Sequence, residues 1–287
     1  MELMHGIRPS PIAGQWYTAE PTRLAAQVDE YIQQAKLPAL PGKVIAIMAP
    51  HAGHRYSGAV AGHAFACLRG LAPDTVAVVS PVHYPYADPL LTTAHQGYAT
   101  PLGTIPVDQD RLADLDQALA KELGFSARRV ANDPEHSLEI ELPFLQRSLE
   151  QPFKLLPLMV RDQSEAVMLR LGRALASCLA GHNALLVAST DLSHFYPQAT
   201  AHRLDHEILS QVEAFNPRGV IQAEEQGKGF ACGRGALASV MWAAQQLGAD
   251  QAILLNYATS GDVTGDFSQV VGYGAAVFIQ SLPEKTG

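Results

Sequence analysis

Cysteine is scarce in this sequence of 287 residues: Cys67, Cys178 and Cys232 are its three cysteines, and they lie far apart. A disulfide framework needs paired cysteines, and secreted proteins usually show them. The N-terminal segment MELMHGIRPSPIAGQWY also lacks the basic stretch and following apolar run of a secretory signal peptide. A cytoplasmic location is therefore the simplest expectation.

Long apolar runs and basic clusters are missing as well. No segment approaches the roughly 18 consecutive apolar residues of a membrane-spanning helix, so we expect no membrane partner. The formal net charge is -8 and the pI is near 5.7, whereas proteins that coat phosphates are usually basic, so nucleic acid is not an expected partner. A G-x-G-x-x-G loop after a strand, a P-loop lysine and a G-x-S-x-G elbow are also absent, which argues against nucleotide chemistry and serine hydrolysis.

Short apolar segments that are typical of buried strands alternate with amphipathic helical stretches. The expected strands are residues 44–49, 75–80, 153–160, 184–190, 251–257 and 270–279. The expected helices are residues 59–68, 108–123, 164–179, a stretch after 198, and 235–247. This alternation predicts an α/β protein with a central mixed or largely parallel sheet and helices on both faces. No linker or repeat interrupts the pattern, so we expect a single domain over residues 1–287.

Histidines follow the ends of three expected strands. His51 comes after the first strand, in PHAGHRYSG, and His83 comes after the second, in SPVHYPY. Asp191 and His194 follow the strand at 184–190, in STDLSH. Ligands of open α/β sheets bind beyond the carboxyl ends of the strands, so this placement favours one shared site.

The segment EHSLEIELPFLQ places Glu135, His136, Glu139 and Glu141 beside apolar residues. We interpret the glutamates as the acidic start of a helix, where negative charge is favourable to the helix dipole. That interpretation does not account for His136, which we therefore add to the candidate site.

Cys232 lies between glycines in GKGFACGRGAL, at the expected start of a helix. The helix dipole and free amide groups there favour a thiolate. The alternative is a small buried residue, which is what we expect of Cys67 and Cys178.

The remaining histidines are expected to be surface or hydrogen-bonding residues; they are His54, His63, His95 and His182. His202 and His206 have the i, i+4 spacing of a metal-binding pair on one helix. Without a further ligand nearby, we interpret them as part of an exposed amphipathic helix.

Two imidazoles and a thiolate would form a three-ligand site for a transition metal, which predicts His51, His83 and Cys232 as ligands. His194 and His136 would then act as acid or base groups, because imidazole titrates near neutrality.

Asp191 would orient an imidazole or hold a substrate proton. A competing hypothesis is a cysteine nucleophile, with Cys232 activated by His194 or His136 and by Asp191.

Seven segments in order resemble the MEMO family, also described in prokaryotes as AmmeMemoRadiSam system protein B, over nearly the whole chain. They are RPSPIAGQWY, PHAGHRYSG, SPVHYPY, EHSLEIELPFLQ, STDLSHF, ACGRGAL and YATSGDVTGDFSQVVGYGAAVF. The resemblance implies a fold similar to class III extradiol dioxygenases, which hold Fe(II) with two histidines and a carboxylate.

Transferred by motif, the resemblance makes His51 and His83 the two histidine ligands and puts Cys232 in the place of the carboxylate. His194 would match the catalytic base of the dioxygenases, and His136 and Asp191 would line the same pocket.

Three positions depart from the usual family pattern: Ser80 and Val82 in SPVHYPY, and Thr190 in STDLSH. They leave the expected ligands in place and affect the geometry of the loops. A thiolate ligand is softer than a carboxylate, so Cu and Zn are alternatives to Fe(II) as the cofactor.

The leading hypothesis is thus a metal-dependent oxidoreductase related to the dioxygenases. An alternative is a non-catalytic adaptor that binds a peptide or small molecule in the same cleft. The family name implies association with a radical-SAM enzyme and an AMMECR-type protein, and the helical surfaces would suit a homodimer.

Overall fold

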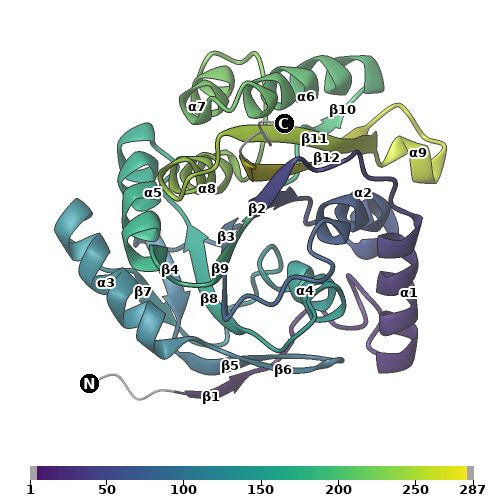
Figure 1. Cartoon of the computed structure of the whole chain (residues 1–287). Coiled ribbons are helices and arrows are strands. Elements are labelled where there is room, and N and C mark those ends of the chain that lie inside the picture. Colours follow the sequence, from purple (N-terminus) through teal and green to yellow (C-terminus); the bar gives the residue numbers. More distant parts are fainter. Residues whose placement is uncertain (1–4, 283–287) are drawn as a thin grey trace, which may run out of the picture.

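Nine strands form the larger of two β-sheets in the computed structural model, which describes residues 5–282 (Figure 1). Their hydrogen-bonded order is β10 (His194–Tyr196), β12 (Val270–Ser281), β2 (Gly42–Ala49), β9 (Ala184–Ser189), β3 (Thr75–Pro81), β8 (Lys154–Val160), β4 (Leu90–Thr93) and β7 (Arg128–Val130), and β11 (Gln251–Thr259) pairs with β12. Strands β2, β9, β3 and β8 are parallel, whereas β12 joins β2 and β4 joins β8 in antiparallel pairs. The predicted mixed sheet is confirmed.

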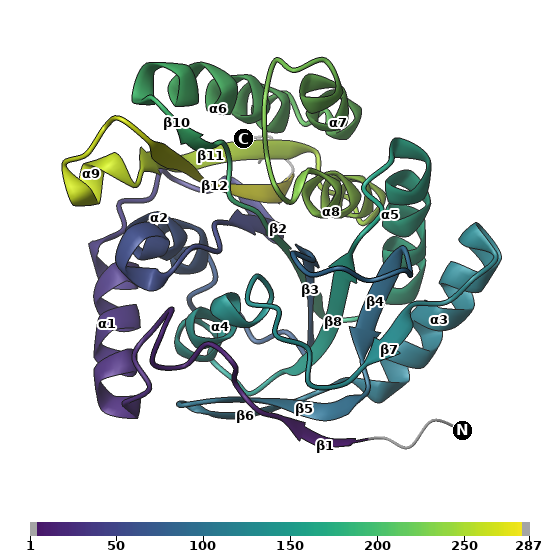
Figure 2. The same ribbon diagram turned by 180° about the vertical axis from the view of Figure 1, so that it is seen from behind.

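Helices cover both faces of this sheet, as predicted (Figures 1 and 2). The helices are α1 (Pro21–Gln34), α2 (His54–Ala66), α3 (Gln109–Leu123), α4 (Leu142–Ser148), α5 (Glu165–Leu179), α6 (Gln198–Glu213), α7 (Pro217–Glu225), α8 (Arg234–Gln246) and α9 (Gly261–Thr264). One face carries α1, α2 and α4, and the other carries α3, α5 and α8, while α6 packs on β11 and β12. Within residues 5–282, no helix is both long and apolar enough to cross a membrane.

Three short strands form a second sheet at the base of the view in Figure 1: β1 (His5–Arg8), β5 (His95–Thr100) and β6 (Gly103–Pro106). The sequence analysis did not predict them, because HQGYAT and GTIP carry no apolar run. Their pairing depends on a contact between distant segments, since β1 lies parallel to β5.

Helix α3 begins and ends where the sequence predicts. The Asp108 side chain accepts a hydrogen bond from the backbone N–H of Arg111 and so caps the helix. Gly124 ends it with a φ of 80°, a left-handed conformation that favours glycine.

The central strands are apolar on both faces because helices cover both. Every residue of β3 is buried, and so are the last five residues of β2. This core fixes the carboxyl ends of β2, β9 and β3 side by side at one edge of the sheet, since the three strands are parallel neighbours.

Glu139 and Glu141 do lie at an acidic helix start, as predicted, but burial raises the pKa of both carboxyl groups. These residues form a short 3-10 helix (η1, Glu139–Glu141), α4 begins only at Leu142, and both glutamates are buried. The Arg8 Nη1 donates to Glu139 Oε2 at 2.5 Å, and the Tyr17 hydroxyl donates to Glu139 Oε1 at 2.7 Å. The local pattern cannot reveal a buried cation that comes from the other end of the chain.

Candidate metal centre

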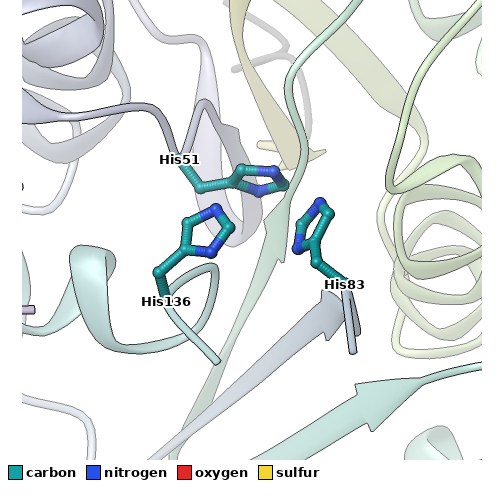
Figure 3. Close-up of side chains that lie close together, drawn as sticks. All are labelled: His51, His83 and His136. Carbon is teal, nitrogen blue, oxygen red and sulfur yellow. The ribbon is translucent and has the colours of Figure 1, made fainter. Parts of the chain in front are cut away.

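Three imidazoles meet at the carboxyl edge of the sheet (Figure 3). His51 follows β2, His83 follows β3, and His136 lies in the loop between β7 and η1. One ring nitrogen of each lies within 4.8 Å of the corresponding atoms of the others, and the group could hold a metal ion. Nitrogen donors on one tetrahedral ion lie about 3.4 Å apart, so modest side-chain movement suffices to close the group.

Hydrogen bonds determine which nitrogen of His51 is free. Its Nδ1 lies 2.9 Å from Ser189 Oγ, and the Ser189 hydroxyl donates to the Ser137 carbonyl oxygen at 2.6 Å. Because the serine proton is used there, Ser189 Oγ accepts from His51 Nδ1–H. The lone pair of His51 is therefore on Nε2.

Glu135 holds the His83 imidazole in the same way and lies beside that of His136. Its Oε1 lies 2.9 Å from His83 Nδ1 and 3.2 Å from His136 Nδ1. The carboxylate also accepts backbone N–H groups of His83 at 2.5 Å, Ser137 at 2.9 Å and His136 at 3.0 Å. Burial opposes its charge, but the hydrogen bonds and imidazoles outweigh burial and hold its pKa at about 2.

An ionised carboxylate only accepts, so His83 Nδ1 bears the proton of its hydrogen bond to Glu135. Carboxylates that orient metal-bound imidazoles in this manner are common in metal sites. The earlier interpretation of Glu135 as a charge for a helix dipole was therefore wrong.

Burial and neighbouring imidazoles favour the neutral forms. Burial lowers the pKa of His51 well below its usual value, and His136, His83 and His194 lower it further. Burial also lowers the pKa of His136 to about 4, although Glu135 opposes the shift. These rings are therefore neutral at pH 7, the state that a metal ligand requires.

His194 and Asp191 lie at the same cavity, as expected of the strand that precedes them. His194 Nδ1 donates to the Leu192 carbonyl oxygen at 2.8 Å, which leaves its Nε2 as an acceptor. Asp191 Oδ1 accepts the backbone N–H of His51 at 2.7 Å and that of Ala52 at 3.3 Å. Burial raises the pKa of Asp191 to about 7. Asp191 thus positions the turn that carries His51.

Cys232 lies two residues before α8, as predicted, with its Sγ 3.1 Å from His51 Nε2 and 3.6 Å from the Asp191 carbonyl oxygen. Burial raises the pKa of this thiol, and the nearby Asp191 charge raises it further. The expectation that the helix start favours the thiolate was wrong, because burial and the Asp191 charge outweigh the hydrogen bonds that favour it.

A cavity of about 760 Å³ opens over the imidazoles. Aromatic side chains form much of its wall, namely those of Trp16, Tyr56, Phe195 and Tyr273. The Trp16 indole stacks on the His136 ring with centroids 3.9 Å apart. None of these wall residues was predicted from the sequence, although all four lie in segments that resemble the family, such as RPSPIAGQWY for Trp16 and STDLSHF for Phe195.

The remaining histidines lie elsewhere. His54 is buried and its Nε2 lies 3.1 Å from the Ile140 carbonyl oxygen, and His95 Nε2 accepts the backbone N–H of Asn132 at 3.0 Å. His206 is exposed and His202 half-buried on α6. Among the described residues neither belongs to a group that could hold a metal ion.

Comparison with known proteins identifies the same family over nearly the whole chain. The family model described as Memo-like protein matches residues 8–277. The chain belongs to the Memo-like family.

Two relatives show how much of this Memo-like chain the likeness covers. A MEMO1 family protein of Nitrosopumilus maritimus is 33% identical over 282 residues, which cover 95% of this chain and 100% of the relative. A MEMO1 family protein of Methanopyrus kandleri is 32% identical, with coverage of 94% and 98%. All residues of the candidate centre fall inside the matched region.

Proposed function

We propose that this Memo-like protein is a metal-dependent oxidoreductase that binds one transition metal ion through His51, His83 and Cys232. The observation that carries the proposal is the arrangement of the imidazoles. The Nδ1 atoms of His51 and His83 each donate to an oxygen of the protein, so Nε2 is the nitrogen of each ring that is available to an ion at the cavity. Proteins orient metal-ligating histidines in this way.

Cys232 is the proposed third ligand because of its place beside His51. A thiolate sulfur and an imidazole nitrogen on one tetrahedral ion lie about 3.6 Å apart, and the observed separation of Sγ and Nε2 is 3.1 Å. His136, whose ring stacks on that of His83 with centroids 4.7 Å apart, is proposed as an acid or base group. Binding of an ion would displace the thiol proton.

Fe(II), or alternatively Cu or Zn, would supply Lewis acidity when bound, and Fe or Cu also one-electron chemistry. The chain's own residues would handle the substrate. His194 Nε2 would accept a proton, and Asp191 would hold the His51 turn in place. Trp16 and Tyr273 would orient a small molecule or peptide side chain and exclude water. A radical-SAM enzyme and an AMMECR-type protein are the proposed partners.

A second candidate is a cysteine-dependent hydrolase or transferase. The 3.1 Å contact of Cys232 Sγ with His51 Nε2 is a thiol–imidazole pair, which is the arrangement that activates such nucleophiles. This candidate predicts Cys232-dependent turnover in protein that has been stripped of metal.

The test is the metal content of anaerobically purified protein, measured by elemental mass spectrometry. We expect about one ion per chain in the wild type and a loss of about 10-fold or more in His51→Ala and Cys232→Ala. The matched control is His202→Ala, on the outer helix α6, which should keep its metal. Folded wild type that cannot be loaded with Fe, Cu or Zn would contradict the proposal.

A further inference from the structure

The turn that carries Cys232 is held from two strand ends. On the β9 side, the backbone N–H of Cys232 donates to the Asp191 carbonyl oxygen at 3.2 Å, and that of Gly233 donates to Thr190 Oγ1 at 2.9 Å. The fit is close, because a Cβ at Gly233 would lie 2.5 Å from the Ser189 carbonyl oxygen.

Gln163 holds the other side of the turn. It lies in the loop between β8 and α5, and its Nε2 donates to the Cys232 carbonyl oxygen at 2.9 Å. Its Oε1 accepts the backbone N–H of Gly235 at 2.7 Å. The carboxamide of Gln163 therefore connects Cys232 with Gly235 in the first turn of α8.

We propose that Gln163 is a positioning residue that sets the direction of the Cys232 thiol toward His51. The relevance to metal binding rests on the proposed function, in which Cys232 is a ligand. Both contacts are to backbone atoms, so Gln163 fixes the path of the turn, and the path fixes where Sγ lies. Among the described residues, Gln163 forms no hydrogen bond with the imidazoles.

The chemistry of the site requires a carboxamide. A carbonyl oxygen needs a donor and an N–H needs an acceptor, and among side chains of this length only glutamine supplies both. A glutamate would keep the bond to Gly235 but set its second oxygen against the Cys232 carbonyl oxygen. A methionine has similar length and makes neither bond.

The experiment compares Gln163→Met and Gln163→Glu with a matched control, Gln245→Met. Gln245 is near the other end of α8, where its Nε2 donates to the Phe215 carbonyl oxygen at 2.8 Å. The control thus removes a similar amide–carbonyl hydrogen bond at the opposite end of α8, away from Cys232.

Two readouts are measured. The first is the alkylation rate of Cys232 by iodoacetamide in chelator-treated protein, with peptide mass mapping to separate it from Cys67 and Cys178. The second is binding of Co(II), with the intensity of the thiolate-to-cobalt absorption band for each bound ion.

In Gln163→Met we expect faster alkylation of Cys232, Co(II) affinity about 10-fold or more weaker and a weaker band per ion. Gln163→Glu should lie between Gln163→Met and the wild type, and Gln245→Met should match the wild type. Circular dichroism establishes that each variant is folded, and Gln163→Glu provides the comparison should Gln163→Met not fold.

Wild-type alkylation rates in both folded Gln163 variants would overturn the positioning role. A different result separates the two proposals. If wild type binds Co(II) without a thiolate band while Gln163→Met still changes the alkylation rate, Gln163 positions the thiol and the assignment of Cys232 as a ligand is wrong.

Discussion

Glu135 and Glu141 lie six residues apart and are each 1% exposed, yet their carboxyl groups have opposite surroundings. Glu135 accepts hydrogen bonds from the His83 imidazole and from three backbone N–H groups, and these contacts hold its pKa at about 2. Neither carboxyl oxygen of Glu141 has a hydrogen-bond partner among the described residues. Burial raises its pKa well above the usual value, and the Asp191 charge raises it further.

The difference shows that burial alone does not decide the charge of a side chain. Arg8 enters from β1 and donates to Asp133, to Glu139 and to the Glu135 carbonyl oxygen. It thereby provides a counter-charge within the stretch 133–139 and binds its backbone, although burial still raises the pKa of Glu139. Arg8 makes no hydrogen bond to Glu141 among the described residues, and desolvation raises the pKa of Glu141 well above its usual value.

The largest expected effect is the loss of stability when the guanidinium of Arg8 is removed. Arg8→Met leaves Asp133 and Glu139 buried without their counter-charge, so the free energy of unfolding at pH 7 should fall by about 3–5 kcal/mol. Urea denaturation measures it. The control Arg147→Met breaks the partly exposed ion pair with Asp29 and should cost at most about 1 kcal/mol. Equal losses in the two variants would show that the Arg8 network is not what stabilises this stretch.

Glu135→Gln is expected to act on metal binding more than on folding. The amide has one acceptor oxygen and cannot accept from the His83 imidazole and three backbone N–H groups at once, so His83 loses its orientation. Affinity for Zn(II), measured by competition with a chelator, should fall about 10- to 100-fold. Asp266→Asn, at the rim of the same cavity, is the control and should bind as the wild type does. Unchanged affinity in Glu135→Gln would remove Glu135 from the site.

The smallest effect is expected for Glu141→Gln, whose stability relative to the wild type should depend on pH. The folded-state pKa of Glu141 lies above the unfolded value of about 4.3. The folded state therefore keeps a proton that the unfolded state releases, and this contribution to stability decreases as pH rises above 4.3. Glu141→Gln carries no such proton, so its stability relative to the wild type should increase from pH 5 to pH 8.

Denaturant unfolding at several pH values tests this expectation. Glu165→Gln, a control at a partly exposed ion pair with Arg218, should show no comparable trend. A Glu141 variant that loses stability equally at every pH would mean that Glu141 is ionised in the folded protein.

Much of the fold follows from local pattern. The central strands β2, β3, β8 and β9 are continuous apolar runs, and α3 has both of its predicted end signals. Helix α1 was missed although its buried residues Leu24, Val28 and Ile32 recur every four positions. The helix expected at 59–68 begins earlier, at His54. Its start was not predicted because Gly53, and not a polar capping residue, precedes it.

The candidate centre, too, was predicted from the sequence only in part. The placement of His51, His83 and His194 after strands predicted that they would share a cavity, because parallel strands end at one edge of a sheet. Cys232 also lies near a helix start, as its glycine-flanked segment predicted. No local pattern indicated that Gln163 would reach the Cys232 turn.

The sequence by itself determined the α/β class, the family and the side chains delivered to one edge of the sheet, since these depend on periodicity and on motifs of adjacent residues. Tertiary structure alone decided that Arg8 binds Glu139, that Glu135 binds the His83 imidazole and that burial raises the pKa of Glu141. Those outcomes depend on which donors from distant segments reach a buried group. Desolvation makes each such contact decisive, because a buried charge is stable only where a partner is present.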